Sequence, residues 1–140
     1  MSSYIIAIFV SWLCVHLIKY ILICNKKKNY KLSLEIFDSG GMPSAHTAIL
    51  ASTTSVIGLT DGFNSGLFAL AAVMLAIVMH DAIRVRRSSG EQGIAISKMI
   101  KEQNSNVEIP RIYKGHNPLE VVFGLLLGII IGSIVFLATK

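Results

Sequence analysis

Charged residues are scarce in this sequence. Asp, Glu, Lys and Arg make up 15% of its 140 residues, against about 25% in an ordinary soluble domain. Apolar residues make up 53%, so the composition argues against a soluble domain and favours a membrane protein. The formal net charge of +5 does not indicate a nucleic-acid partner, because the basic residues lie between apolar runs rather than along one polar face.

Cysteines and metal-binding motifs are scarce as well. Cys14 and Cys24 lie in one apolar run, separated by about 15 Å of helix, which is too far for a disulfide between them. The sequence contains no Cys-x-x-Cys motif, no His-Glu-x-x-His motif and no acid-rich metal pattern. We therefore expect no metal and no other cofactor.

The sequence does contain several long apolar runs, and a helix of about 20 apolar residues crosses a bilayer core. The second run is shorter than the first, and its serines and threonines suit a helix packed among other helices. We predict an all-α integral membrane bundle of four transmembrane helices, forming a single domain over residues 1–140. These helices are expected at about residues 4–24, 43–60, 66–84 and 118–138.

Two further patterns concern the surfaces of these helices. Residues 88–115 form the one long polar stretch, and its apolar residues interleave with charges. This pattern predicts a short amphipathic helix at the cytoplasmic surface of the membrane. In the last apolar run, Gly124, Gly128 and Gly132 follow a four-residue spacing, which presents a packing face to another helix.

The basic residues are distributed unevenly between the predicted loops. Of the 13 Lys and Arg residues, four lie in the loop after the first run, seven in the loop after the third, and none in the turn at residues 60–66. Because positive loops stay in the cytoplasm, we expect both basic loops and the hinge at residues 40–43 to face it. Both termini would then face away. Lys19, near the basic end of the first run, is expected to extend its ammonium to that surface.

On this topology, three helix ends with chemically useful side chains meet at the cytoplasmic face. Glycine amides and a helix N-terminus attract an anion, and the forked donors of arginine suit phosphate. Two histidines with an orienting carboxylate are the groups that phosphoryl transfer through a histidine requires. The residues concerned are Gly40, Gly41, Ser44 and His46, then His80, Asp81, Arg84 and Arg87, and finally His116, Asn117 and Glu120.

The start of the last run has two interpretations. His116 and Glu120 lie four positions apart, so the carboxylate can hold one ring nitrogen of the histidine and raise the basicity of the other. Asn117, Pro118 and Glu120 also fit a capping box with proline in the first turn. The capping box accounts for Asn117, Pro118 and Glu120 but gives no role to His116. Glu120 can complete the cap and hold the histidine ring at the same time.

The end of the third run is less distinctive. Asp81 and Arg84 lie three positions apart, so they can form an ordinary surface ion pair. Arg86 and Arg87 can face lipid headgroups or can bind phosphate. His80 has no neighbour placed to activate it, and we assign it a structural role.

Three motifs resemble the divergent membrane branch of the type 2 phosphatidic acid phosphatase superfamily, which is labelled acid phosphatase/vanadium-dependent haloperoxidase related. They are Gly-Gly-Met-Pro-Ser-Ala-His at residues 40–46, Asp-x-x-Arg-x-Arg-Arg at residues 81–87 and Gly-His-x-Pro-x-Glu-Val at residues 115–121. The resemblance implies that His116 is the nucleophile, that Glu120 orients it and that His46 is the general acid. The phosphate-binding residues, with the arginines as alternative sources of the cation, would be Gly40, Gly41, Ser44, Asp81, Arg84, Arg87 and Arg111.

The motifs and the composition together predict a metal-independent phosphatase that faces the cytoplasm. Its substrate would be a phospholipid phosphate or an isoprenoid phosphate or pyrophosphate, cleaved through a phospho-histidine intermediate. The alternative is a non-catalytic binder or transporter of phosphorylated lipid that retains the anion pocket. Members of the superfamily usually have more core helices than four, so we expect a homodimer through the face of Gly124, Gly128 and Gly132.

Overall fold

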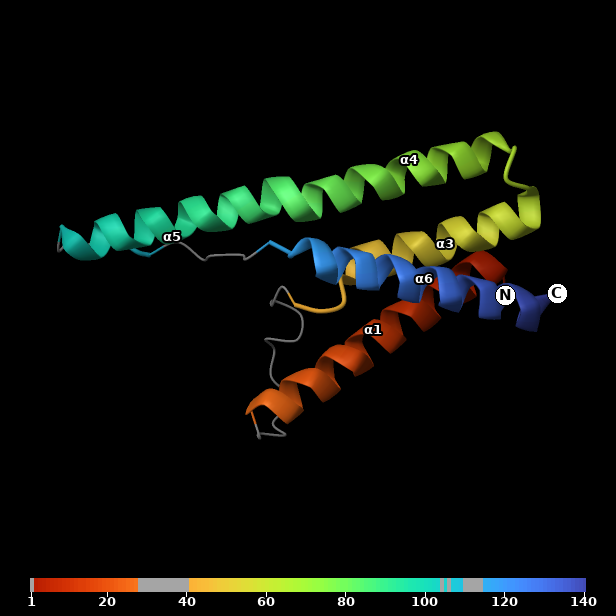
Figure 1. The fold of residues 1–140 in the computed structure, drawn as a ribbon, viewed down its shortest axis with the longest axis horizontal. Coiled ribbons are helices and arrows are strands. Elements are labelled where there is room, and N and C mark those ends of the chain that lie inside the picture. The colour runs from red at the N-terminus through yellow and green to blue at the C-terminus, as the bar shows by residue number, and fades with distance from the viewer. Residues whose placement is uncertain (1, 28–40, 104, 106, 110–114) are drawn as a thin grey trace.

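The computed structural model describes residues 2–27, 41–103, 105, 107–109 and 115–140. Within these ranges the chain forms helices and no β-strand, which confirms the predicted all-α class. Figure 1 shows the arrangement. In chain order the elements are α1 (Ser3–Lys27), α3 (Ala45–Asp61), α4 (Gly66–His80), the π-helical segment η1 (Asp81–Val85), α5 (Arg86–Glu102) and α6 (Pro118–Thr139).

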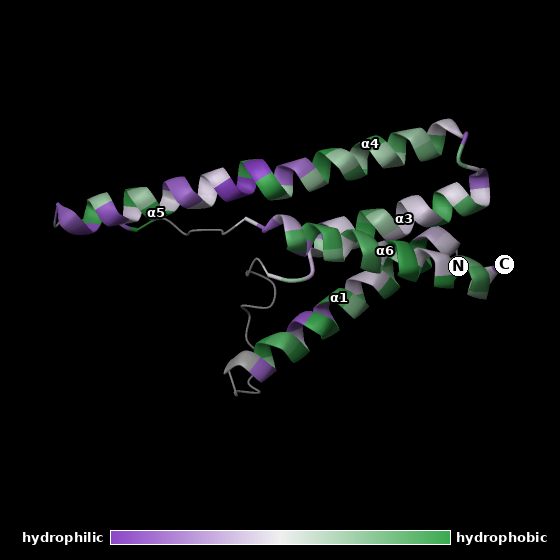
Figure 2. Ribbon diagram, viewed as in Figure 1, coloured by the Kyte–Doolittle hydropathy of each residue, from purple (hydrophilic) through white to green (hydrophobic). Residues whose placement is uncertain are grey.

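Three helical segments are long and apolar enough to cross a membrane: Ser3–Asn25, Gly66–Glu102 and Pro118–Thr139. Their surfaces expose large apolar side chains such as Leu70 and Leu137, and the ribbons of α1, α4 and α6 are largely hydrophobic in Figure 2. Such surfaces require lipid rather than water around them. The chain is therefore an integral, multi-pass membrane protein. α3 has 17 residues and is not among the three segments.

α3 is the central helix of the bundle, since α1, α4 and α6 all pack against it. Its buried face consists mainly of small and hydroxyl-bearing residues, which let neighbouring backbones approach closely. Ser52 Oγ donates to the Ala7 carbonyl of α1 at 3.0 Å, and Thr54 Oγ1 donates to the Ala71 carbonyl of α4 at 3.5 Å. These hydroxyl groups therefore join α3 to its neighbours, in agreement with the role predicted for this run.

The glycine face of α6 packs against α3 of the same chain. A Cβ atom on Gly124 would lie 2.6 Å from the Ser44 carbonyl oxygen, and one on Gly128 would lie 2.6 Å from Ala51 Cβ. Gly132 meets the backbone of α3 in the same way. The glycines form a helix-packing face, as predicted, but the predicted homodimer through this face is not confirmed. The reason is that α3 already covers all three glycines.

α4, η1 and α5 form one continuous helix of 37 residues, Gly66–Glu102 (Figure 1). At 1.5 Å per residue this helix is about 55 Å long, whereas the bilayer core is about 30 Å thick. α5 consequently extends beyond the rest of the bundle. The sequence predicted a short amphipathic helix here, and the structure has one, α5, which continues directly from α4 and η1. No proline occurs between residues 66 and 102, so nothing forces the backbone to leave the helix.

The two ends of the bundle differ in what they contain. The N- and C-termini lie at the same end as the turn between α3 and α4 (Figure 1). At the opposite end, the start of α3, the end of α4 and the start of α6 come together. Two backbone hydrogen bonds join these helix ends: Ser44 N donates to the Glu120 carbonyl at 3.0 Å, and His116 N donates to the Ala82 carbonyl at 3.1 Å. This end of the bundle carries the candidate site.

Candidate functional site

The residues just before α6 dock onto η1. The His116 backbone N–H donates to the Ala82 carbonyl at 3.1 Å. Gly115 lies directly on the backbone of Arg86 and Arg87, where a Cβ atom would come within 2.7 Å of the Arg86 carbonyl carbon, so no side chain fits at this position. π-Helical turns inside α-helices occur frequently at functional sites. Here η1 and Gly115 together fix the position of His116 against the end of α4.

His116 and Glu120 form a closely spaced pair at the start of α6. His116 Nδ1 lies 2.8 Å from Glu120 Oε2, and His116 is only 8% exposed. The same carboxylate oxygen accepts a hydrogen bond from the Asn117 backbone N–H at 3.2 Å, and Pro118 occupies the first turn. Glu120 thus caps the helix and holds the imidazole of His116 at the same time. Since Nδ1 is occupied, Nε2 is the ring nitrogen left for a substrate.

Ser44 ties the start of α3 to α6. It is fully buried, its backbone N–H donates to the Glu120 carbonyl at 3.0 Å, and its hydroxyl oxygen accepts from Thr47 Oγ1 at 3.1 Å. Gly41, three residues earlier, has a φ angle of +132°, which side chains other than glycine rarely adopt. Gly40, which the sequence also assigned to phosphate binding, lies outside the described residues.

His46 lies on the first turn of α3, and its side chain is exposed. The charged groups that act on it come from other elements: Asp81 in η1, Arg86 in α5, His116 before α6, and Lys19 in α1. The two histidines singled out in the sequence therefore share one electrostatic neighbourhood. Cationic side chains outnumber carboxylates in this set, which favours the binding of an anion.

The arginines of η1 and of the first turn of α5 have different partners. Arg86 Nε lies 2.6 Å from Asp81 Oδ2, whereas the sequence suggested that Asp81 could pair with Arg84. A π-helix bonds residues five apart, so the segment brings Asp81 and Arg86 together. Arg84 and Arg87 instead line a cavity of about 430 Å³ next to the start of α6, and Arg87 Nε also pairs with Glu91 Oε1 at 3.1 Å.

Two residues of this region were not predicted. Lys19, whose ammonium was expected to extend to the membrane surface, is 7% exposed as a residue, and its charge lies within electrostatic reach of His46 and Glu120. The sequence did not distinguish the role of Arg86 from the roles of Arg84 and Arg87. The sequence signal for Lys19 was its charge inside an apolar run. This signal does not show which other helices the lysine side chain faces. Arg111, a further candidate cation, lies outside the described residues.

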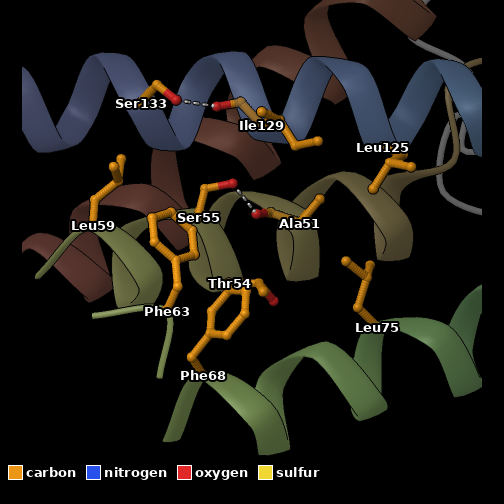
Figure 3. Close-up of a pocket in the computed structure, with 10 residues that line it drawn as sticks. All are labelled: Ala51, Thr54, Ser55, Leu59, Phe63, Phe68, Leu75, Leu125, Ile129 and Ser133. Atoms are coloured by element: carbon orange, nitrogen blue, oxygen red, sulfur yellow. Dashed lines mark hydrogen bonds between the residues drawn. The ribbon is translucent and has the colours of Figure 1, made fainter. Parts of the chain in front are cut away.

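A second cavity, of about 270 Å³, lies between α3, α4 and α6. Its lining is mainly apolar, and Figure 3 shows Phe68 and Leu75 of α4 facing Thr54 of α3 across it. The cavity begins close to the candidate site, because Ala51 is in its lining and lies about 7.5 Å along α3 from His46. No titratable side chain lines this cavity. The cavity therefore suits the binding of an apolar group rather than a catalytic step.

The candidate site contains groups that bind anions and move protons. Its imidazole, carboxylate, guanidinium and ammonium groups can do both. In the described part of the chain, no group of three or more His, Cys, Asp or Glu side chains is placed to hold a metal ion. The donor set therefore matches an anionic ligand better than a metal.

These features define a multi-pass helical membrane protein with histidines, a carboxylate and cations gathered at one end of its bundle. The chain matches the Divergent PAP2 family over residues 1–131, so it belongs to this family, as the three motifs predicted. PAP2 denotes type 2 phosphatidic acid phosphatase. The membrane protein YuiD of Bacillus subtilis (strain 168), described as uncharacterized, is 34% identical over 124 residues, covering 78% of this chain and 77% of the relative. No solved structure matches the chain.

Proposed function

We propose that the protein is a phosphatase that removes phosphate from a lipid phosphate or an isoprenoid pyrophosphate at the membrane surface. The observation that carries this proposal is the pair formed by His116 and Glu120, whose Nδ1 and Oε2 atoms lie 2.8 Å apart. His46 lies in the same electrostatic neighbourhood, and membership of the Divergent PAP2 family supports the same chemistry.

In the first step, His116 Nε2 attacks the phosphorus atom, and the bond from phosphorus to the leaving oxygen breaks. Glu120 accepts a hydrogen bond from the Nδ1–H group, which keeps the lone pair on Nε2 and stabilises the positive charge that develops on the ring. His46, in its protonated form, donates a proton to the leaving oxygen. The dephosphorylated lipid departs, and the phosphoryl group remains on His116.

In the second step, water attacks the phosphorus atom of the phospho-histidine. His46, now neutral, accepts a proton from this water, and the electron pair of the nitrogen–phosphorus bond returns to Nε2. Inorganic phosphate leaves, and both histidines are regenerated. Backbone amides at Gly40 and Gly41 and nearby cations would stabilise the charge on the equatorial oxygens. The Ser44 backbone N–H already donates to the Glu120 carbonyl at 3.0 Å, so Ser44 would support the site through α6 rather than bind the phosphate.

The segment from η1 into the start of α5 would contribute to binding rather than to bond breaking. Arg84 and Arg87 line the 430 Å³ cavity beside the start of α6, where they would attract the anionic headgroup. Asp81 would act through Arg86, since the two side chains lie 2.6 Å apart. These residues are expected to affect substrate affinity more than the rate of the chemical step.

A lipid is the proposed substrate because the site adjoins both lipid-facing helices and an apolar cavity. The 270 Å³ cavity lies between α3, α4 and α6, with Phe68 and Leu75 in its lining. Its lining residue Ala51 is about 7.5 Å along α3 from His46, so a chain attached to a bound phosphate could extend into it. An acyl or isoprenoid chain fits such an apolar lining.

The proposed topology has four spans, with α3 as the fourth. Its 17 residues give about 25 Å of helix, which approaches the thickness of a bilayer core. With four spans, the site faces the cytoplasm, because the loops at that end hold most of the basic residues. Both termini would then face the opposite side.

The direct test is phosphate release by the purified protein in detergent, assayed with phosphatidic acid, lysophosphatidic acid and isoprenoid diphosphates. We expect turnover of at least one of these, and His116→Ala should reduce it to background because no other group replaces the nucleophile. With a radiolabelled substrate, an acid-labile label should appear on the protein and should be missing from His116→Ala. The matched control is His80→Ala, since His80 is exposed and has no proposed role in binding or bond breaking. If the panel yields no turnover that depends on His116, the proposal fails.

Binding or transport of a phosphorylated lipid without hydrolysis is the second candidate function. It is favoured by the exposure of His46, since no hydrogen bond within the described residues holds this imidazole for proton transfer. A wild-type protein that binds a lipid phosphate without releasing phosphate, and a His116→Ala variant that binds it equally well, would support this candidate over the phosphatase.

A further inference from the structure

The 270 Å³ cavity between α3, α4 and α6 is long and narrow. Its lining on α3 includes Ala51, Ser55 and Leu59, which follow a four-residue spacing and so share one face of the helix. Its lining on α6 runs from Leu125 to Ser133 with the same spacing. Each of these stripes covers about 12 Å of helix. The cavity therefore extends along the bundle rather than across it.

One end of the cavity is the end nearer the candidate site. Ala51 follows His46 on α3 by about 7.5 Å of helix, and Leu125 follows Glu120 on α6 by the same distance. Leu75 of α4 lies at this end as well, opposite Leu125 in Figure 3. All three helices thus lead from the site into the same end of the cavity.

Two aromatic rings form the far end. Phe63 and Phe68 pack edge to face, with ring centroids 5.1 Å apart and an angle of 81° between the rings, which is a favourable arrangement. Both rings lie against Gly58 of α3, where a Cβ atom would come 2.6 Å from Phe63 Cε1 and 3.0 Å from Phe68 Cδ2. Figure 3 shows the two rings beside Leu59. Large side chains therefore end a cavity whose sides are lined partly by Ala, Ser and Thr.

The hydroxyl groups in the lining already have partners. Thr54 Oγ1 donates to a backbone carbonyl of α4 at 3.5 Å. Ser55 and Ser133 each donate to the carbonyl four residues earlier in their own helix at 2.8 Å. With these groups satisfied and no titratable side chain in the lining, the cavity suits a hydrocarbon rather than a polar ligand.

The size of the cavity indicates how much hydrocarbon it can hold. An apolar cavity of about 150 Å³ accepts benzene, which has six carbons, so 270 Å³ accommodates roughly ten. Ten carbons along about 12 Å correspond to one chain rather than two side by side. The same spacing over the roughly 7.5 Å between the site and the cavity adds about six carbons. A chain of about sixteen carbons would thus reach from the site to the aromatic pair.

We propose that the cavity binds one hydrocarbon chain of the phosphorylated ligand, and that Phe63 and Phe68 limit the length of this chain. The phosphorylated end of the ligand rests on the proposed function, whereas the chain site rests on the cavity itself. A second chain, in a ligand that has two, stays in the surrounding lipid. Phe63 and Phe68 are then specificity-determining residues that belong to none of the three sequence motifs.

The location of the chain is tested by photocrosslinking of the full-length protein in detergent with hexadecyl phosphate that carries a diazirine at the end of its chain. We expect mass spectrometry to find the label at Leu59, Phe63 or Phe68. Excess hexadecyl phosphate should remove this label, whereas excess hexadecanol should not, because the alcohol lacks the group that anchors the chain at the site. Equal removal by hexadecanol would identify free hydrocarbon, such as bilayer lipid, as the occupant and would overturn the inference.

A substitution that fills the cavity tests its use in binding. Ser133→Leu adds apolar volume near the far end, so we expect the affinity for hexadecyl phosphate to fall about fivefold or more. Octyl phosphate, whose chain ends before this position, should bind unchanged. Microscale thermophoresis measures both affinities, and the ratio of variant to wild type cancels the partitioning of each ligand into micelles. The matched control is Thr139→Leu, which replaces another hydroxyl group of α6 outside the cavity.

A substitution that opens the far end tests the length limit. Phe63 is 62% exposed, so Phe63→Ala is expected to fold. It should raise the affinity for eicosyl phosphate, with twenty carbons, about fivefold relative to the wild type and leave that for hexadecyl phosphate unchanged. The control is Phe123→Ala, which removes a phenyl group from an exposed position of α6 outside the cavity.

An equal change for octyl and hexadecyl phosphate in Ser133→Leu would overturn the inference, since that is the result of a purely structural role. Unchanged affinity for eicosyl phosphate in Phe63→Ala would remove the length limit. The phosphatase proposal fails separately: chain-dependent binding without phosphate release keeps this inference and removes the enzyme. Phosphate release that depends on His116, with no chain-dependent effect in either variant, does the reverse.

Discussion

At the scale of single residues, the two roles of Glu120 can be separated by one substitution. Its Oε2 atom accepts from the Asn117 backbone N–H at 3.2 Å and lies 2.8 Å from His116 Nδ1. Glutamine retains a side-chain oxygen that can serve the capping box. It removes the negative charge that would stabilise a positively charged imidazole. The cap supports the fold, whereas the charge supports the proposed chemistry.

For Glu120→Gln we expect kcat for phosphate release to fall roughly 100-fold or more. KM and the midpoint of SDS unfolding should change little, because the helix remains capped. Steady-state kinetics and circular dichroism measure these quantities. The control is Glu102→Gln at the exposed end of α5, which should retain full activity. Wild-type kcat in Glu120→Gln would remove Glu120 from the mechanism.

At the scale of elements, glycines rather than large side chains set the distance between α3 and α6. A Cβ atom on Gly128 would lie 2.6 Å from Ala51 Cβ and closer still to the Ala48 carbonyl oxygen. Because a helix backbone cannot yield locally, the two helices would have to separate. The same contact includes the hydrogen bond from Ser44 N to the Glu120 carbonyl. A change in the spacing of α3 and α6 would therefore also displace the site residues at the starts of these two helices.

We expect Gly128→Ala to lower the free energy of unfolding by about 1–3 kcal/mol, although alanine alone favours a helix by about 1 kcal/mol over glycine. The matched control is Gly66→Ala, where a Cβ atom meets nothing within 4 Å. SDS titration followed by circular dichroism compares the two variants. Equal stability of Gly128→Ala and Gly66→Ala would contradict the close approach of α3 and α6.

At the scale of the whole molecule, the proposed sidedness and the fourth span can be tested together by cysteine labelling. The two native cysteines, Cys14 and Cys24, are free and would first be replaced by alanine. With four spans, Ser2→Cys and Asn64→Cys lie on one side of the membrane and Gln103→Cys on the other, because α3 returns the chain to the side of its N-terminus.

On intact cells, a membrane-impermeant maleimide should label Ser2→Cys and Asn64→Cys, whereas Gln103→Cys should react only after permeabilisation. Positive loops remain in the cytoplasm, which sets this direction. If intact cells were labelled at Gln103→Cys but not at Ser2→Cys and Asn64→Cys, the protein would have the opposite orientation in the membrane. Labelling of Ser2→Cys and Asn64→Cys from different sides would show that α3 does not cross the membrane.

The sequence by itself determined the features that depend on neighbouring residues along the chain. Apolar runs predicted the all-α membrane class, because a helix in lipid must satisfy its backbone internally and present apolar side chains outward. His116 and Glu120 could be paired from their four-residue spacing, since a helix places such residues on one face. The three motifs identified the family for the same reason, as each is a short local pattern.

Only the tertiary structure decided which helices face one another. It gave the glycines of α6 an internal partner in α3, and it placed Lys19 of α1 within the electrostatic reach of Glu120. It also paired Asp81 with Arg86 through a π-helical turn. Apolar runs in a membrane protein are hydrophobic on all sides, so the pattern does not fix how each helix is rotated. That rotation follows from close packing between segments far apart in the chain.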